Sequence, residues 1–455
     1  MTIATINRFI QLLQASFEAL HASVSIEQLE HMAVLIHSAM ESPRRRYHSA
    51  DHALHLCEGM NPRQVLAASF HDIVYLQLDD GFPSRAADLL HPLARRVGDD
   101  MLLSEIASDD STLQLCLELF GFQSGQRLLL LGGMNEFFSA VVAARMLQAH
   151  LTQADLIAVL ACIEATVPFR GPEDDGRNCS QALADRVRIQ ARKRLGLADG
   201  DALDAFVAGV MADAIHMANR DVGGFAEPDS ARFVSATWLL IEESNAPLAS
   251  VGVYTLQDYR EALSRMQGFL ESLQPGRVFR CYDGQPSAQD FEHLTAAAAT
   301  NIGFTCAFLR LKITSISIIE ALARATGGNG PVSMFLGDIH SSQGVPERIE
   351  DYLPTGPDTP GLDAHILQLL KKGRLQESKN DLTVSPLTAY VYRCLGPAAC
   401  ATALVDAKRM VQGEISPLDF LKTLDPDMVY TVIDACARIA ISRSERLMRL
   451  KTQLR

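Results

Sequence analysis

The spacing of the apolar residues constrains the fold of this chain more than any other feature. Apolar side chains recur at intervals of three and four residues nearly everywhere, and no convincing run alternates between apolar and polar residues. Such intervals place apolar side chains on one face of a helix, whereas a half-buried strand needs alternation. Alanine and leucine, which favour helices, are abundant, and aromatic residues make up only 6%. The sequence therefore predicts an all-α fold. Helices are expected, among other places, over residues 48–59, 62–77, 85–97, 101–107, 202–219 and 426–450.

The length of the chain predicts more than one domain. At 455 residues it exceeds what one ordinary hydrophobic core accommodates. Residues 273–288 concentrate proline, glycine and polar side chains and are interpreted as a linker. We therefore expect one domain over residues 1–275 and a helical accessory domain, whose role is open, over residues 289–455.

Charge and cysteine content exclude some classes of protein. A net charge of −13 argues against a protein that coats nucleic acid polymers, because the phosphate backbone needs a basic surface. The nine cysteines form no CxxC pair and lie mostly in apolar context, which is typical of reduced core residues in a cytoplasmic protein. No signal-peptide cleavage region follows the N-terminus, and glycine and charged residues interrupt the most apolar window, residues 128–147. We therefore expect no membrane association.

Two segments carry the residues of a candidate metal site. His48, His52 and His55 are spaced to lie on one face of the helix expected there, and His71 and Asp72 follow at the end of an apolar helix. Imidazole and carboxylate groups are ordinary ligands of divalent metal ions. Burying such groups without partners costs roughly 2–7 kcal/mol each, or more for a charge. The alternative is a core histidine hydrogen-bonded to an aspartate, but the two segments together favour a metal site.

The same segments resemble a known family. Residues 47–53 (YHSADHA) resemble the Tyr-His-Asn-x-x-His-Ala segment of cyclic-nucleotide phosphodiesterases, and residues 70–73 (FHDI) resemble their His-Asp motif, which the wider HD superfamily of phosphohydrolases shares. The resemblance covers residues 40–80 well and residues 150–225 weakly, and it does not reach the C-terminal 180 residues. No Gly-Tyr-Pro signature follows, so the branch of the superfamily that carries it is not indicated.

The resemblance implies a fold and a set of roles. The fold would be a multi-helical HD-domain bundle, followed by the helical C-terminal region. His52, His71 and Asp72 would be ligands of one or two divalent ions (Mn, Mg, Zn or Fe). His48 would occupy the place of the general acid that protonates the leaving oxygen.

The fourth ligand departs from the family pattern. The phosphodiesterases have His-x-Ala-Asp where this chain has His216-Met-Ala-Asn219, with Asn219 in the place of the ligand aspartate. Asp221 follows two residues later, and the glycines after it suggest that the helix ends and lets its carboxylate turn inward. We rank Asp221 first as the metal ligand, ahead of Asn219 and Asp213.

A second departure concerns the later helix around Glu164. The family motif Ala-Thr-Asp places an aspartate where this chain has Val167. Glu164 follows an apolar stripe and should face inward, where a metal-bound water or a ligand histidine would give it a catalytic role. The alternative is a pair with Arg170 or another cation. Elsewhere, Asn135 and Glu136 interrupt an apolar helix and are interpreted as an inter-helix hydrogen bond or as support for the metal ligands.

The expected activity is metal-dependent hydrolysis of a phosphate ester. Its substrate would be a small phosphorylated molecule, a nucleotide or cyclic nucleotide phosphodiester. Arg44 and Arg45 would bind the phosphate, unless they form a solvated helix entry. Two alternatives remain: a non-catalytic metal- or nucleotide-binding sensor or scaffold on a degenerate HD fold, and an HD-fold di-iron oxygenase. We also consider a homodimer.

Overall fold

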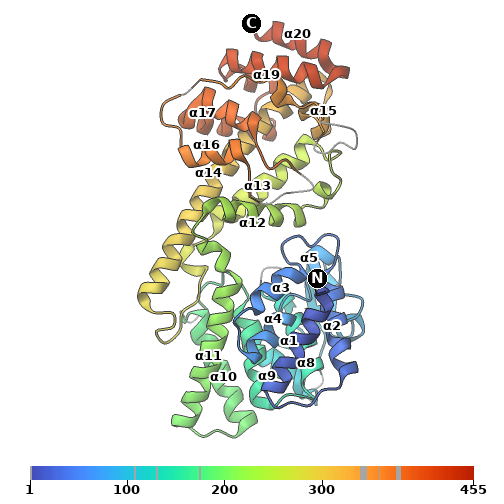
Figure 1. Ribbon diagram of the computed structural model, residues 1–455, viewed down its shortest axis with the longest axis vertical. Helices are drawn as coiled ribbons and strands as arrows, with labels where there is room; N and C mark the ends of the chain where they lie inside the picture. Colours follow the sequence, from blue (N-terminus) through green and yellow to red (C-terminus); the bar gives the residue numbers. More distant parts are fainter. Residues whose placement is uncertain are drawn as a thin grey trace. The chain divides into compact units, whose positions relative to one another are not determined.

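Helices form most of the chain. The computed structural model describes residues 3–106, 109–129, 132–173, 176–338, 346–357, 359–375 and 381–455 (Figure 1). It is 67% helical, and strands account for only 4%. The predicted all-α class is therefore confirmed.

The chain divides into two compact units. The first unit comprises Met1–Ala226 and Leu273–Ala298, and the second comprises Glu227–Ser272 and Ala299–Arg455. The segment 227–272 thus belongs with the C-terminal part of the chain. The assignment of residues 1–275 and 289–455 to domains with separate roles stays a prediction.

The first unit is organised around a central helix, α9 (Gln153–Ala165). Every residue of α9 from Asp155 onward is buried, and α9 packs against α4, α8, α10 and α11. A helix that is apolar on all sides is stable only where other helices surround it. The helices of this unit are α1 (Thr5–Ala19), α2 (Ile26–Met40), α3 (Ala50–Cys57), α4 (Pro62–Phe70), α5 (Leu76–Asp79), α6 (Ala87–Leu90), α7 (Ser111–Phe120), α8 (Met134–Leu147), α9, α10 (Cys179–Leu195) and α11 (Asp201–Asp221), and the 3-10 turn η1 (Gly223–Ala226) follows.

Local signals fix both ends of α4. The side chain of Asn61 accepts a hydrogen bond from the backbone N–H of Gln64, whose side chain in turn accepts from the backbone of Asn61. This reciprocal pair satisfies two of the N–H groups that a helix start leaves free, and Pro62 suits the first helical position. The helix ends at Phe70, so His71 and Asp72 lie just beyond its last turn.

A small antiparallel sheet replaces part of the predicted helical region. Its strands are β1 (Ala94–Val97), β2 (Asp100–Leu103) and β3 (Arg127–Leu128). The helices predicted over residues 85–97 and 101–107 are therefore wrong beyond α6. Gly98 opens the two-residue connection between β1 and β2 with φ of 67°, a conformation that favours glycine. Strands of four residues or fewer are too short to display alternation in the sequence.

Other helix boundaries differ by a few residues. The helix predicted over 48–59 begins at Ala50, and the one predicted over 62–77 ends at Phe70. The helix predicted over 202–219 continues to Asp221. The segment predicted as one helix over 426–450 is two helices.

The second unit is also helical. Its helices are α12 (Ser230–Glu243), α13 (Leu256–Ser272), α15 (Val332–Leu336), α16 (Ala364–Lys372), α17 (Pro386–Gln412), α18 (Pro417–Lys422), α19 (Pro426–Ile439) and α20 (Ser444–Leu454), with 3-10 turns η2 (Ala246–Ala249), η4 (Ile349–Tyr352) and η5 (Ile441–Arg443). Helix α14 (Ala288–Gly327) begins in the first unit and continues in the second. The 3-10 turn η3 (Pro275–Arg277) belongs to the first unit.

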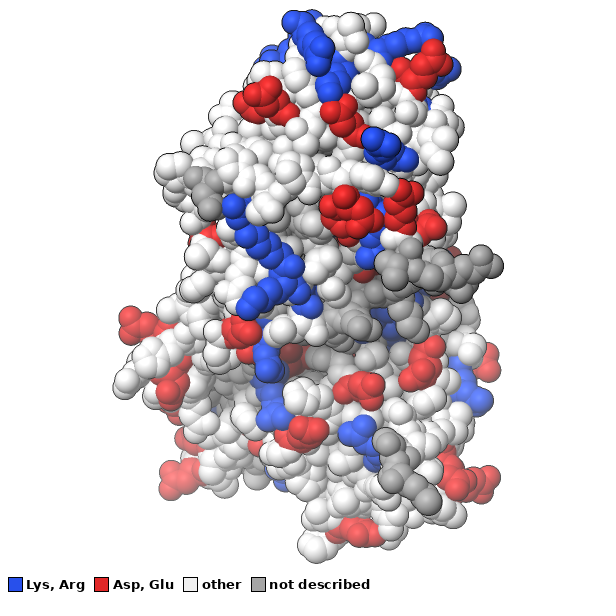
Figure 2. All heavy atoms as spheres, turned by 45° about the horizontal axis from the view of Figure 1, so that its top comes forward, with Lys and Arg blue, Asp and Glu red and all other residues white. Residues whose placement is uncertain are grey.

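Basic side chains of the C-terminal segment satisfy the end of α14. Arg443 donates to the carbonyls of Ala323 and Gly328, each at 2.7 Å, and Arg446 donates to the carbonyl of Thr326 at 3.1 Å. The last carbonyls of a helix lack partners within it and favour positive charge. Figure 2 shows lysine and arginine near its top, where the C-terminal helices lie, interspersed with acidic side chains.

Helix α14 is long and apolar enough to cross a membrane by length and composition alone. Its most apolar window has a mean hydropathy of 1.6, and 78% of that window is buried inside the protein. Core helices of water-soluble proteins pass the same test, so this is weak evidence for a membrane span. The expectation that the chain avoids membranes stays a prediction.

Candidate metal centre

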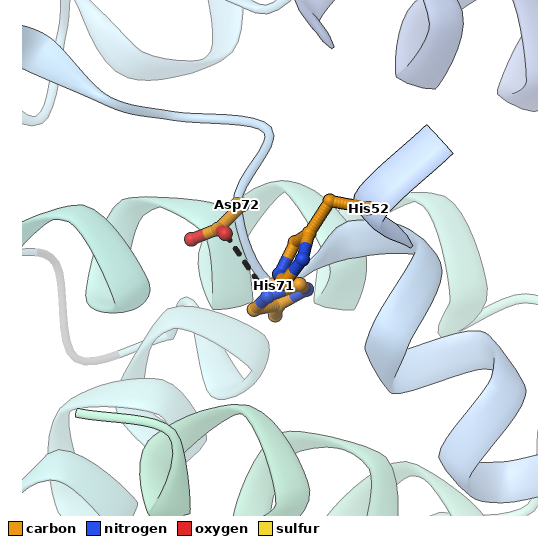
Figure 3. Close-up of side chains that lie close together, drawn as sticks. All are labelled: His52, His71 and Asp72. Carbon is orange, nitrogen blue, oxygen red and sulfur yellow. Dashed lines mark ion pairs between the residues drawn. The ribbon is translucent and has the colours of Figure 1, made fainter. Parts of the chain in front are cut away.

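Two histidines and an aspartate from separate segments meet inside the first unit. His52 comes from α3, and His71 and Asp72 follow α4 (Figure 3). Each offers one ligand atom, and these atoms all lie within 4.8 Å of one another. His71 and Asp72 are buried, and His52 is half-buried. The three residues predicted to form half of a metal site are thus adjacent.

The end of α4 determines which nitrogen of His71 faces the cluster. The Nδ1 atom lies 2.8 Å from the carbonyl oxygen of Ala68. A carbonyl only accepts, so Nδ1 carries the proton of that hydrogen bond. Nε2 then lies 3.0 Å from Asp72 Oδ2 and 3.4 Å from Asp221 Oδ1, without a directed hydrogen bond to any described residue. This buried nitrogen points at two carboxylates.

Asp221 supplies the second carboxylate. It is the last residue of α11, and its Oδ1 atom also lies 3.2 Å from Nε2 of His52. The glycines after Asp221 had suggested that the helix ends before this residue. Instead, α11 continues through Asp221. Residues two apart lie on nearly opposite sides of a helix, so Asp221 and Asn219 face different neighbours.

The other two candidates for the fourth ligand are engaged elsewhere. Asn219 donates to the carbonyl of Arg280 at 2.9 Å and accepts from its backbone N–H at 2.7 Å, so both ends of its amide are used. Asp213 accepts from the side chain of Asn61 at 2.6 Å. Of the three candidates, Asp221 is the one recorded in contact with the histidines.

The electrostatics of the cluster favour a cation. Burial opposes charge on His71, but the carboxylates of Asp72 and Asp221 raise the pKa of its imidazole well above the usual value. Against the effect of burial, His71 lowers the pKa of Asp72, and the histidines lower that of Asp221 to about 2. Both carboxylates are therefore ionised, and the site holds a proton or binds a metal ion in its place.

His48 lies beside this cluster, before the start of α3. Its ring centroid is 4.7 Å from that of Tyr75 and 6.1 Å from that of His52. His48 also contributes to the lowered pKa of Asp72, so the two groups are within electrostatic range. His55, expected on the same face, instead has a side chain that is 77% exposed and pairs with Glu58.

Arg45 has a structural role that its assignment to phosphate binding did not foresee. Its side chain is fully buried, and it donates to the carbonyls of Asp72 at 2.6 Å and Ile73 at 3.3 Å. It also donates to the carboxylate of Asp79 and to the carbonyl of His48, the latter at 3.5 Å. These contacts fix the peptide that carries Asp72 and leave Arg45 poorly placed to bind a substrate. Arg44 is exposed, and its predicted contact with phosphate stays a prediction.

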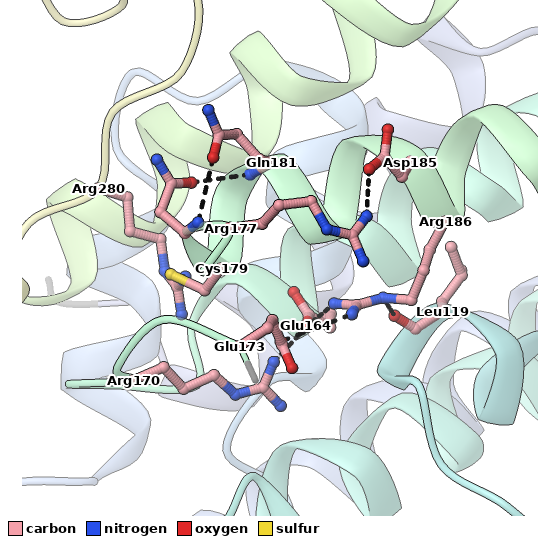
Figure 4. A network of polar contacts seen from close by, with 11 residues as sticks. Leu119, Glu164, Arg170, Glu173, Arg177, Cys179, Gln181, Asp185, Arg186 and Arg280 are labelled. Carbon is pink, nitrogen blue, oxygen red and sulfur yellow. Dashed lines mark hydrogen bonds and ion pairs between the residues drawn. The ribbon is translucent and has the colours of Figure 1, made fainter. Parts of the chain in front are cut away.

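Glu164 belongs to a separate network. Its carboxylate is fully buried and accepts from Arg186 at 2.7 Å and from Arg170 (Figure 4). This pairing with cations is the alternative that the sequence left open. No contact of Glu164 with His52, His71 or Asp72 is recorded among the described residues, so its catalytic assignment gains no support.

Glu136 is a titratable group to which the sequence analysis gave no definite role. It lies in the first turn of α8, and burial raises the pKa of its carboxyl to about 7, with Asp72 adding to the effect and Arg170 and His71 opposing it. It therefore lies within electrostatic range of the cluster. Asn135 accepts from the backbone N–H of Leu76 and makes the inter-element hydrogen bond expected of this pair. The signal in the sequence that could have identified Glu136 is a carboxylate inside an apolar helix.

No family model, curated protein or solved structure matches this chain. The resemblance of residues 40–80 to the HD superfamily therefore stays a prediction.

Proposed function

We propose that this chain hydrolyses a phosphate ester with the help of a divalent metal ion, and that its substrate is a nucleotide or cyclic nucleotide phosphodiester. One observation carries the proposal: the buried Nε2 atom of His71 faces two carboxylates, while Nδ1 is committed to a backbone carbonyl. Neutral imidazole with that tautomer presents a lone pair, which a metal ion satisfies and an aspartate does not.

The donor set fits a divalent ion. His52, His71, Asp72 and Asp221 offer two imidazole nitrogens and two carboxylate oxygens within a few ångströms. Zinc, iron and manganese all accept such ligands. An ion bound there would polarise a phosphoryl oxygen and lower the pKa of a coordinated water.

The remaining steps fall to side chains of the chain itself. His48 would donate a proton to the leaving oxygen, a role that suits imidazole near neutral pH. The ring of Tyr75 packs against the ring of His48 and restricts its orientation. Arg45 holds the peptide of Asp72, and the carbonyl of Ala68 keeps His71 in the tautomer that points Nε2 inward. The chain thus supplies an acid and a rigid ligand frame.

The test compares two changes that differ in distance from the cluster. The purified chain is analysed for bound metal and assayed with a generic phosphodiester and a panel of mononucleotides and cyclic nucleotides. The His71→Ala, Asp72→Ala double variant should lose both metal and hydrolysis. The matched control is His55→Ala, because His55 lies on the same helix as His52 but is exposed and paired with Glu58. The proposal would be disproved if the wild-type chain bound no metal and hydrolysed none of these substrates.

A second candidate is a protein that binds metal or nucleotide without turnover. Two groups assigned to substrate binding or catalysis, Arg45 and Glu164, are held in structural contacts. That candidate predicts metal in the purified chain and nucleotide binding by calorimetry, with no hydrolysis of any member of the panel. Iron with a redox-active spectrum would favour the di-iron oxygenase instead.

A further inference from the structure

A cavity of about 560 Å³ begins one residue after Tyr75, whose ring packs against the ring of His48. Leu76 and Gln77, the first two residues of α5, line it. Asn135 of α8 fixes this stretch, because it accepts from the backbone N–H of Leu76 at 3.1 Å and donates to the side-chain oxygen of Gln77 at 2.9 Å. One wall of the cavity therefore directly follows, along a fixed segment, the residue that contacts the candidate proton donor. Small-molecule sites typically have volumes of about 300–1,000 Å³.

The rings of Phe82 and His91 form an aromatic wall of this cavity. Both residues line it, their ring centroids are 5.5 Å apart, and the ring planes make an angle of 75°. Phe82 also contacts the fully buried ring of Phe138 in α8, with centroids 5.0 Å apart, which restricts its orientation. His91 is exposed, so a ligand reaches its ring. An aromatic surface of this kind binds flat ring systems by stacking.

The charges that line the cavity cancel. Arg95 and Arg96 belong to β1, Asp80 follows α5, and Asp99 lies in the connection to β2. Arg96 pairs with Asp80 at 3.4 Å, and no ion pair of Arg95 or Asp99 is recorded among the described residues. Two positive and two negative side chains give no preference for an anion. They provide hydrogen-bond donors and acceptors around the aromatic wall instead.

The position of the cavity determines which part of a phosphate ester would occupy it. His48 is the candidate donor of a proton to the leaving oxygen, so the leaving alcohol lies on the side of His48 and Tyr75, and the phosphate lies at the candidate metal ligands. In a mononucleotide and in a cyclic nucleotide alike, the leaving oxygen belongs to the nucleoside. A nucleoside is uncharged, has a flat base, and carries hydroxyl groups and polar base edges, which are the groups that this cavity can contact.

We propose that this cavity binds the nucleoside part of the substrate, with the base stacked on Phe82 and His91 and its polar groups bonded to Arg95 and Asp99. The identity of the ligand rests on the proposed function. The lining of the cavity includes none of the candidate metal ligands. Nucleoside binding should therefore persist in a chain from which metal has been removed.

Binding of nucleosides to the metal-free chain tests the cavity separately from hydrolysis. The full chain is treated with a chelator, and adenosine, guanosine, cytidine, uridine and ribose are titrated into it by calorimetry. At least one nucleoside should bind, whereas ribose, which lacks the base, should not. The inference is overturned if none of the four nucleosides binds or if ribose binds as tightly as they do. Nucleoside binding by a chain that hydrolyses no member of the panel would remove the proposed function and leave the cavity assignment intact.

Two variants locate the bound base. Phe82→Leu keeps an apolar side chain without the ring, and His91→Ala removes the exposed ring, so each should weaken nucleoside binding by about tenfold, as when a base loses a stacking partner. Phe122→Leu is the matched control and should bind as wild type, because Phe122 is a half-buried phenylalanine of the same unit that contacts Phe137 and does not line the cavity. Melting temperatures exclude unfolding. The same affinity in all three variants would overturn the assignment of the cavity.

Discussion

Two buried charged clusters in the first unit differ in how their charges are balanced. In one, the Oε1 atom of Glu164 contacts the guanidinium groups of both Arg170 and Arg186. In the other, the carboxylates of Asp72 and Asp221 face imidazole nitrogens that are cationic only when protonated. The negative charge of the first cluster is matched by permanent cations of the chain, whereas the second cluster calls for a cation from outside it.

Both clusters are buried, so burial does not distinguish a structural network from a candidate site. The way the charges are balanced does. Arginine keeps its charge at every accessible pH, so a carboxylate held by two arginines has no need of a metal ion. Histidine exchanges its proton for a metal ion near neutral pH. We therefore expect the two clusters to respond differently when a carboxylate is removed.

The largest effect on stability should come from Glu164→Ala. The change leaves Arg170 and Arg186 buried without their carboxylate, and breaking a buried pair in this way costs about 3–5 kcal/mol. Urea unfolding should show this loss, while metal content stays that of wild type. The control is Glu173→Ala: Glu173 lies 3.9 Å from Arg186 with a side chain 41% exposed, so its loss should cost less than about 1 kcal/mol. Loss of metal in Glu164→Ala would contradict the separation of the two clusters.

The second unit contains a buried cluster with an excess of positive charge, and it tests whether such a cluster also adjusts its charge. Lys312 and Arg374 lie 3.6 Å and 3.2 Å from one carboxylate, that of Asp381, and both cations also contact the ring of Trp238. Burial lowers the pKa of the Lys312 amine to about 8, with Arg374 contributing and Asp381 opposing. This cluster can reduce its charge by losing a proton.

The sign of the pH dependence follows from that shift. Between pH 8 and about 10.4 the unfolded chain keeps the proton on Lys312 while the folded chain has lost it, so stability rises with pH through this window. The gain is on the order of 3 kcal/mol at most. Urea unfolding at several pH values gives the free energies of unfolding of wild type and Lys312→Met. The difference between the two should change through this window. A difference that stays constant from pH 7 to pH 10 would contradict the burial of a charged Lys312.

In the candidate metal centre, Asp221→Asn removes the negative charge of the side chain and keeps its shape. We expect metal affinity to fall by about 100-fold, as when a metal site loses a strong partner. Competition with a chelator of known affinity measures the change. Asp213→Asn is the control on the same helix, because Asp213 bonds to Asn61 instead. Equal losses in both variants would show that the effect is structural and not one of coordination.

The sequence predicted the parts of this cluster that depend on local signals. His71 and Asp72 follow an apolar helix with clear capping residues, and a polar pair in that position needs partners wherever the helix packs. Asp221 was ranked first, but its orientation depends on whether α11 ends before or after it. Helix ends are uncertain by a residue or two in any sequence, and that is enough to turn a side chain to the opposite side.

What the sequence could not predict depends on long-range packing. Arg45 reaches the carbonyls of residues 27 and 28 positions later, and Arg186 reaches Glu164 from the next helix. A flexible arginine side chain has many partners within reach, so neither pairing follows from spacing. The short strands of the sheet were missed for a different reason, because two to four residues carry no measurable period.

The smallest expected effect concerns the frame around Asp72. Arg45→Lys keeps the charge, but one ammonium group cannot bond at once to Asp79 and to the carbonyls of Asp72 and Ile73. The peptide that carries Asp72 should then shift, and kcat for the best substrate of the panel should fall by about tenfold, with KM little changed. Arg44→Ala is the contrast: if exposed Arg44 binds the phosphate, that change raises KM and leaves kcat intact. A rise of KM in Arg45→Lys, with kcat unchanged, would instead return Arg45 to substrate binding.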